Sequence, residues 1–182
     1  MSHDKVIHFA MGSGCDKAKL GRWTWSQFRG KGEMVLRVVG AYRPCTSSGG
    51  ERTDWVQHKA YFNDHNNDRD PRDAFMEDLA ADIQEWIQEG DQVIVGGDLN
   101  EEIRGSAIKE FFAGLGMHNL IFQNHNETDA PTTFFRNKSG KVLYGIWGTA
   151  NISAIKCGHL EPCDFPGDHS AVWMETFPTS VH

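Results

Sequence analysis

The segment Gly96-Gly97-Asp98-Leu99-Asn100 places a carboxyl group and an amide group two residues apart, directly after an apolar run. Asp98 and Asn100 could point an acceptor and an amide into one pocket, and the two glycines would let the backbone approach a substrate closely. Ligands of α/β proteins bind at the carboxyl ends of strands, where this segment would lie. The alternative is an Asx turn, because Asp and Asn after a strand are ordinary turn residues.

Two further segments carry side chains suited to chemistry. Asp168 and His169 precede an apolar run, and they supply a carboxylate for a cation and an imidazole for proton transfer. Tyr42 and Arg43 end another apolar run, and the planar guanidinium group of Arg43 suits a phosphate. The alternatives are a loop pair without a partner for Asp168 and His169, and an ordinary surface arginine for Arg43.

Patterns of apolar residues predict the elements that must position these segments. Residues 22–28 and 34–42 predict a β-hairpin around a glycine-containing turn. Residues 71–90 repeat apolar side chains at helical spacing after a proline, and residues 92–97 form a short apolar run typical of a buried strand. A helix that leads into a buried strand indicates a mixed α/β fold. Further elements are expected at 55–62 and 106–114 (helices) and at 132–136, 142–147 and 171–177 (strands).

Composition and length suit a single globular domain over residues 1–182. The chain has a mass of 20.5 kDa and is 39% hydrophobic and 24% charged, which excludes disordered and fibrous proteins. No apolar run approaches the ~18 residues that span a bilayer. The first residues lack the pattern of a secretory signal. We therefore expect no membrane partner and, by default, a cytoplasmic or nuclear location.

Charge is distributed unevenly along the chain. Acidic residues outnumber basic ones by 25 to 18, giving a net charge of -7, which argues against a generally basic nucleic-acid coat protein. Residues 1–60 nevertheless hold ten Lys and Arg against five Asp and Glu, a balance of +5. Such asymmetry can mark a side that faces a polyanion. The alternative is a soluble acidic domain with one solvated basic strand pair.

The four cysteines are too sparse for a disulfide scaffold in a chain of this length. Cys157, His159 and Cys163 supply three zinc donors within seven residues, but their spacing fits no common zinc module. Free thiols in a reducing compartment are therefore the expected state.

Taken together, these segments resemble the endonuclease/exonuclease/phosphatase superfamily, which includes the DNase I-like enzymes. The resemblance covers about residues 19–177, and its motifs occur in the family's order. AYRP is similar to the Y-x-P motif, GGDLN to G-D-x-N, and GDHSAV to S-D-H-x-x-V. PTTF and LYGIWGT look like the family's T-[FY] and I-D-x-I-W strands. LGRWTW followed by RVVGAYRPC resembles the endonuclease domain of non-LTR retrotransposons.

The resemblance implies a layered β-sandwich with flanking helices, the DNase I-like fold, and metal-dependent hydrolysis of a phosphodiester. By motif position, Asp98 would orient or deprotonate a water molecule, Asn100 would hold Asp98 or a phosphate oxygen, and His169 would stabilise or protonate the phosphoryl group. Tyr42 would support the phosphate or the leaving group, and Asp168 would bind Mg²⁺ or Mn²⁺. Nucleic acid, DNA in preference to RNA, would be the partner, with the basic segment 1–60 as its track.

Two departures from the family's pattern limit this expectation. The family's first half, which carries a metal-binding Glu, has no counterpart in the sequence. Tyr144 stands where the family has the Asp that orients the catalytic His, and a neutral phenol does not stabilise an imidazolium as a carboxylate does. We therefore expect weak or absent hydrolysis, the alternative being a catalytically inactive nuclease fold that serves as a binding or assembly subunit.

An incomplete first half would also leave one sheet face uncovered and expose apolar surface. Trp23, Trp25 and Phe28 lie in the strand pair expected nearest this gap. We therefore expect a homo-oligomer, or a partner chain, to pack on these side chains. The alternative is that the three aromatic residues form an internal core.

Overall fold

Six strands form the main sheet, in the order β1-β2-β3-β4-β6-β5, and two more form a separate hairpin. The computed structural model describes residues 9–30, 32–46, 50, 52–127, 132–134, 140–160 and 169–178. The strands are β1 (Ala10–Cys15), β2 (Trp23–Arg29), β3 (Val35–Tyr42), β4 (Gln92–Asp98), β5 (Met117–Asn119), β6 (Tyr144–Thr149), β7 (Ile152–His159) and β8 (Val172–Pro178). The helices are α2 (Asp54–Asp64), α3 (Pro71–Gln88) and α4 (Ser106–Gly114).

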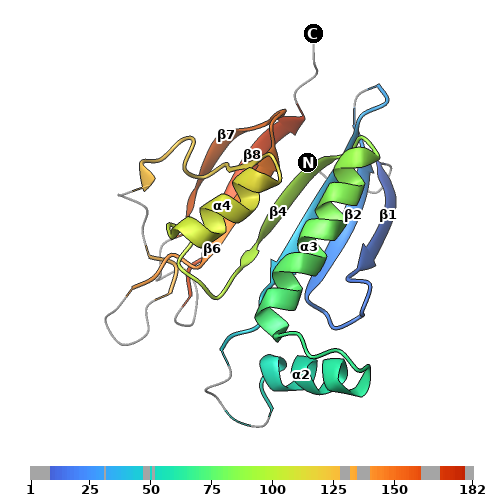
Figure 1. Ribbon diagram of the computed structural model, residues 1–182. Coiled ribbons are helices and arrows are strands. Elements are labelled where there is room, and N and C mark those ends of the chain that lie inside the picture. The colour runs from blue at the N-terminus through green and yellow to red at the C-terminus, as the bar shows by residue number, and fades with distance from the viewer. Residues whose placement is uncertain are drawn as a thin grey trace.

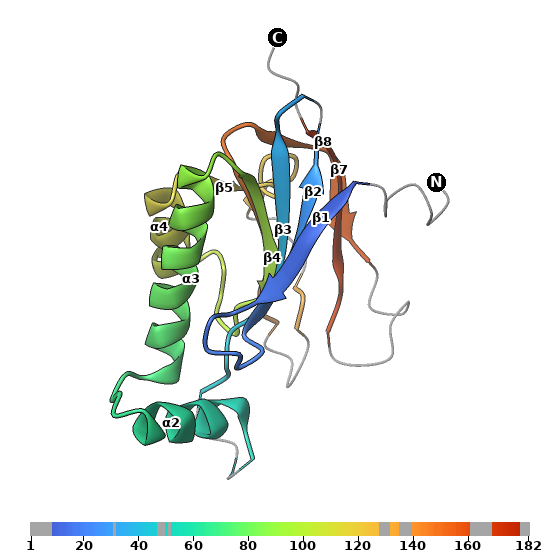
Figure 2. The ribbon, with the colours of Figure 1, turned by 90° about the vertical axis from the view of Figure 1, so that its right-hand side faces the viewer.

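The two views of the molecule show three layers (Figures 1 and 2). Helices α3 and α4 cover one face of the main sheet, and the β7–β8 hairpin lies on its other face. This arrangement confirms the predicted mixed α/β class with layered sheets and flanking helices. None of the helices in the described ranges is both long and apolar enough to cross a membrane.

Strand pairing in the middle of the main sheet decides which residues become neighbours. Strands β2 and β3 are antiparallel, which confirms the predicted hairpin. Strands β3 and β4 are parallel, so the chain between them must cross over, and it does so through α2 and α3. Strand β6 then pairs with the other edge of β4 in the antiparallel sense. The C-terminal ends of β3 and β4 therefore meet the start of β6.

Helix α3 follows the apolar pattern that predicted it. The side chain of Asp70 accepts hydrogen bonds at the N-terminus, and Pro71 occupies the first turn, where a missing N–H group costs nothing. Gly90, with φ at 94°, takes the left-handed conformation just after the helix. The face toward the sheet is fully buried and includes Phe75, Leu79 and Ile83.

The tryptophans of β2 belong to this core. Trp23 is 2% exposed and meets the Phe75 ring edge-on at 5.6 Å between centroids. Trp25 packs against Trp86 of α3, with 6.2 Å between ring centroids. The expectation of an association surface is therefore wrong for Trp23, because helix α3 covers its side chain, and the alternative of an internal core is confirmed for it. Trp25 and Phe28 are half-buried, so association through these two side chains stays a prediction.

Acidic residues of the same chain neutralise much of the basic excess in residues 1–60. Within the part of the chain that the structure describes, five of the ten basic side chains in residues 1–60 form ion pairs, and all but one of their acidic partners come from beyond residue 60. These five basic residues are Lys17, Arg22, Arg37, Arg43 and Lys59. Their charges hold the N-terminal strands to α3 and to the loops, so these five do not form an open track for a polyanion.

The ion pairs of Asp78 in α3 allow the contribution of such pairing to stability to be tested. Its carboxylate accepts hydrogen bonds from Arg22, 1% exposed, at 2.8 Å and from Arg69 at 2.7 Å. Burial would raise the pKa of Asp78, but the hydrogen bonds from Arg69 and Arg22 outweigh burial and hold the pKa below its usual value. Asp78→Asn should lower the free energy of unfolding by about 2 kcal/mol at pH 7, because the buried guanidinium of Arg22 loses one of its two charged partners and keeps only Asp16.

The sign of the pH dependence follows from the lowered pKa. The stabilisation is fully present above the pKa of the unfolded carboxyl group, ~4, and is lost as pH falls through the lower folded value. Urea unfolding at pH 7 and at about pH 3 should therefore show a smaller difference between Asp78→Asn and wild type in acid. Asp64→Asn, at an exposed position at the end of α2, is the control and should change stability little at either pH. An equal difference at both pH values would contradict the role of this ion pair.

Candidate active site

The register of the main sheet brings three of the predicted segments into one row. Tyr42 in β3 is the pairing partner of Asp98 in β4, and Asp98 is the pairing partner of Tyr144 in β6. The Tyr144 hydroxyl oxygen lies 2.7 Å from Nδ1 of His169, which precedes β8. We call Tyr42, Asp98, Tyr144 and His169 the site row. It lies at the end of the sheet near which α2 is placed (Figure 1).

An Asx turn fixes Asp98 and Asn100. The backbone N–H of Asn100 donates to Oδ1 of Asp98 at 2.8 Å, which confirms the turn proposed as the alternative. Asn100 has φ at 48°, in the left-handed region that Asn tolerates better than most residues. Its side-chain amide donates to the carbonyl oxygen of Arg43 at 2.7 Å. The turn thus orients the Asp98 carboxylate and joins the ends of β3 and β4, whereas a catalytic role for either residue stays a prediction.

The Asp98 carboxyl group is buried, at 7% exposure. Burial raises its pKa, while the Asn100 N–H, the charge of His169 and the Tyr144 hydroxyl group act in the opposite direction and only partly offset burial. A carboxylate with a raised pKa is a stronger base than an exposed one. This environment suits a residue that accepts a proton.

Burial also raises the pKa of Tyr42, which keeps its phenol protonated and able to donate a hydrogen bond. The Asn100 side chain acts against this shift through a hydrogen bond to Tyr42. Tyr42 is 41% exposed, so its ring faces solvent at the open side of the row. It is therefore placed to meet a molecule that approaches Asp98.

Gly97, directly before Asp98, allows strands β3 and β4 to lie close together. A Cβ atom on Gly97 would lie 2.0 Å from the carbonyl oxygen of Ala41 in β3. A Cβ atom on Gly96 would meet nothing closer than 3.8 Å. The close backbone approach that Gly97 allows in this structure is to the neighbouring strand, and an approach of a substrate to the two glycines stays a prediction.

Arg43 is 7% exposed and is held within the loops around the site. Its guanidinium group forms an ion pair with Glu101, and Arg72 of α3 binds the same carboxylate at 2.9 Å. Arg72 also donates to the carbonyl oxygen of Pro44 at 2.6 Å. A substrate phosphate would have to compete with Glu101 for Arg43, so the predicted phosphate contact remains untested. Sequence reasoning missed Arg72, because its position at the start of a helix resembles a solvated face.

Thr133 connects Tyr144 with the segment that carries His169. It is fully buried, and its hydroxyl oxygen accepts the backbone N–H of Tyr144 at 3.2 Å. Its carbonyl oxygen accepts the N–H of Ser170 at 2.9 Å, next to His169. The ring of Phe134 lies 4.9 Å from the His169 ring, between centroids. The predicted strand over 132–136 is described only to Phe134, where it forms isolated bridges.

The described residues do not by themselves complete a cation site. Across those parts of the chain, no three His, Cys, Asp or Glu side chains lie together in a way that could hold a metal ion. Asp98 supplies one buried carboxylate, and Glu101 is engaged by two arginines. Asp168, the predicted metal ligand, lies outside the described residues. A cation at the site row would therefore need ligands beyond those that the structure describes.

The cysteine positions agree with the expectation of free thiols. Cys15, Cys45 and Cys157 are all unbridged. Cys157 is 8% exposed, and its thiol points at the backbone carbonyl oxygen of Leu120 at 3.7 Å. Cys163, the other cysteine of the considered zinc cluster, lies outside the described residues.

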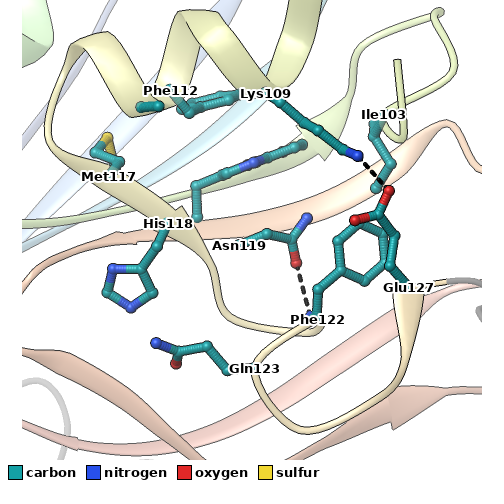
Figure 3. A pocket seen from close by; sticks show the side chains of 11 residues that line it. Ile103, Lys109, Phe112, Met117, His118, Asn119, Phe122, Gln123 and Glu127 are labelled. Atoms are coloured by element: carbon teal, nitrogen blue, oxygen red, sulfur yellow. Dashed lines mark hydrogen bonds and ion pairs between the residues drawn. The ribbon is translucent and has the colours of Figure 1, made fainter. Parts of the chain in front are cut away.

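A hollow of about 340 Å³ lies elsewhere, between α4, β5 and the turn that follows β5 (Figure 3). Phe112, Met117 and Phe122 line its apolar part, and an ion pair between Lys109 and Glu127 stands at one side. No member of the site row lines it. The site row is therefore identified by its chemical groups and not by this hollow.

Comparison with known proteins finds relatives by structure alone. No protein-family profile and no curated protein sequence matches the chain. The catalytic domain of human Nocturnin, with bound sulfate, superposes with a TM-score of 0.59 and 15% identity over 90% of this chain and 57% of that one. An endonuclease/exonuclease/phosphatase protein from Beutenbergia cavernae gives 0.58 and 11% over 93% of this chain and 45% of that one.

A 3′-5′ exonuclease from Neisseria meningitidis, NExo, gives a TM-score of 0.59 and 16% identity over 92% of this chain and 72% of that one. A structure of NExo from Neisseria, described as a 3′ phosphatase, holds a product DNA hairpin. The structural neighbours are thus endonuclease/exonuclease/phosphatase proteins, and the fold of this chain is DNase I-like. The chain spans about half the length of the Nocturnin and Beutenbergia proteins.

Proposed function

We propose that this protein hydrolyses phosphodiester bonds at the site row, as a nuclease-like enzyme. The observation that carries the proposal is the row itself. Asp98, Tyr144 and His169 come from separate parts of the chain, yet sheet register and a 2.7 Å hydrogen bond bring them together at the carboxyl end of β4. The DNase I-like fold of the neighbours supports the same reaction class at a general level.

The proposed roles follow from burial and contacts. Asp98, buried and oriented by the Asn100 N–H, would accept a proton from the attacking water. His169 has Nδ1 engaged by Tyr144, so Nε2 is the nitrogen that would meet a phosphoryl oxygen and stabilise or protonate it. Tyr42, with its exposed phenol, would donate to the phosphate or the leaving group. Arg43 would act mainly by holding the loop through Glu101.

We propose Mg²⁺ or Mn²⁺ as the cofactor, with Asp168 as one ligand. When bound, a hard cation neutralises phosphate charge and polarises the phosphoryl group. This part of the proposal rests on the resemblance of the Asp168-His169 segment to a family motif, because the described residues do not complete a cation site.

We propose nucleic acid as the substrate, with DNA preferred to RNA. The product DNA in a NExo structure supports this class of substrate. The resemblance to the endonuclease domains of non-LTR retrotransposons points the same way and stays a prediction, as does assembly with a second copy or a partner chain.

Cation removal tests the proposal. Supercoiled plasmid and a short RNA would be incubated with purified protein and Mg²⁺ or Mn²⁺, with and without excess EDTA. We expect slow nicking of the plasmid that EDTA abolishes and that returned cation restores. Hydrolysis that persists in EDTA would remove the cation from the mechanism, and no hydrolysis of either substrate or of a small phosphodiester would contradict the proposed function.

The second candidate function is binding without hydrolysis. Tyr144 favours it, because the family motif has an aspartate at this position and the described residues hold no complete cation site. A nuclease fold that has lost its chemistry would retain nucleic-acid binding. Measuring binding and cleavage on the same substrate separates the two candidates.

A further inference from the structure

The Tyr144 hydroxyl group lies between two groups that matter to the proposed reaction. Its oxygen is 2.7 Å from Nδ1 of His169. Tyr144 is also the antiparallel pairing partner of Asp98, and side chains of such pairs lie on the same face with Cβ atoms about 5 Å apart. The hydroxyl group lowers the pKa of Asp98 as a hydrogen-bond donor does. The phenol of Tyr144 thus bonds the imidazole and lies beside the buried carboxylate of its pairing partner.

A phenol carries one proton, so it donates to only one of these neighbours at a time. Donation to an ionised carboxylate is a charge-assisted hydrogen bond, which is stronger than donation to a neutral ring nitrogen. With its proton directed at Asp98, the Tyr144 oxygen presents a lone pair to His169. Nδ1 of His169 must then carry a hydrogen atom, which leaves Nε2 as the nitrogen that exchanges its proton.

We propose that Tyr144 is a positioning residue that connects Asp98 to His169 and fixes His169 as the tautomer with hydrogen on Nδ1. Asp98 thereby takes on, through a phenol, the orienting task that the family motif gives to an aspartate at position 144. This inference deepens the proposed function, because it concerns the same site. It explains how a neutral residue at this position is compatible with an oriented histidine.

The surrounding hydrogen bonds hold this arrangement in place. Thr133, fully buried, accepts the N–H of Tyr144 through its hydroxyl oxygen and the N–H of Ser170 through its carbonyl oxygen. Both ends of the contact between Tyr144 and His169 are thus tied to one residue. Asp98 is fixed separately by the Asn100 N–H. The contact therefore joins two independently anchored groups.

The test reads the tautomer of His169 directly, without substrate or cation, so its outcome does not depend on whether the protein hydrolyses anything. ¹H–¹⁵N long-range correlation spectra of protein with ¹⁵N-labelled histidine would be recorded at about pH 8.5, where histidine side chains are ordinarily neutral. The chain has nine histidines, and the loss of one signal in His169→Gln assigns the one of interest.

We expect the wild type to show hydrogen on Nδ1. In Asp98→Ala the phenol loses its acceptor and turns its proton to Nδ1, so His169 should switch to the tautomer with hydrogen on Nε2. Tyr42→Phe removes a phenol from the other side of Asp98 and should leave the tautomer unchanged. Hydrogen on Nε2 in the wild type, or an unchanged tautomer in Asp98→Ala, would overturn the proposal.

Asp98 is buried, so backbone amide spectra must show that Asp98→Ala is folded. If it is not, Tyr144→Phe supplies the second test, because it keeps the ring and removes only the hydroxyl group. His169 should then lose its single Nδ1-protonated state. A wild-type spectrum that persists in folded Tyr144→Phe would equally overturn the proposal.

Discussion

His169→Ala should reduce kcat/KM for phosphodiester hydrolysis by about 10²–10⁴-fold, the range that general acid–base groups contribute. The substitution removes the imidazole whose Nδ1 lies 2.7 Å from the Tyr144 hydroxyl oxygen. Asp98→Ala should cause a loss of similar size. The double variant should lose little more than either single variant, because residues that act as one unit are not additive.

His65→Ala is the matched control for this prediction. His65 is exposed at the end of α2, where its ring stacks on Tyr61 at 4.1 Å between centroids. Rates would be measured on one labelled oligonucleotide with proteins of equal purity. Activity in His169→Ala equal to that in His65→Ala would show that the reaction occurs elsewhere or comes from a contaminant.

Gly97→Ala should destabilise the fold by about 3 kcal/mol or more, the upper part of the range for forcing an atom into packed structure. The added Cβ atom would lie 2.0 Å from the Ala41 carbonyl oxygen, and backbone in the middle of a sheet has little freedom to move. Gly96→Ala places its Cβ atom no closer than 3.8 Å to any neighbour, so it should change stability by less than about 1 kcal/mol.

The two variants add the same methyl group at adjacent positions in β4, so their difference isolates the contact with β3. Unfolding in urea, followed by tryptophan fluorescence, gives both stabilities. Equal midpoints for Gly96→Ala and Gly97→Ala would show that β3 and β4 are not as close at this point as the structure places them.

Local patterns were sufficient to predict the elements that carry the site. Proline and regular apolar spacing predicted α3, and a short apolar run predicted β4. Strand β1 was missed because its sequence, AMGSGC, consists mainly of small residues and shows no alternation of apolar and polar side chains. Strand β7 was missed for a related reason, since its bulge interrupts the alternation.

The candidate site was predictable as residue types but not as an arrangement. The chain order of Tyr42, Asp98 and His169 resembled a family, yet their contacts depend on a parallel pairing of strands separated by two helices. Such pairing is a property of topology that no local pattern contains. The bond between Arg72 and Glu101 likewise depends on how α3 meets the loop after β4.

The same limit applied to charge and to the aromatic residues of β2. The basic excess in residues 1–60 indicated a surface for a polyanion, but five of its ten charges pair with acids of this chain. Trp23, expected at an interface, is instead buried beneath α3, and Trp25 packs against Trp86 of the same helix. In both cases the partner came from a distant part of the sequence.

The most direct test of the central claim measures binding and single-turnover cleavage of one labelled single-stranded DNA, with excess protein and Mg²⁺ or Mn²⁺, for wild type and Asp98→Ala. The account predicts that both proteins bind the DNA and that only the wild type cleaves it. Binding without cleavage by either protein would contradict hydrolysis at the site row and leave a nucleic-acid-binding protein with a nuclease fold.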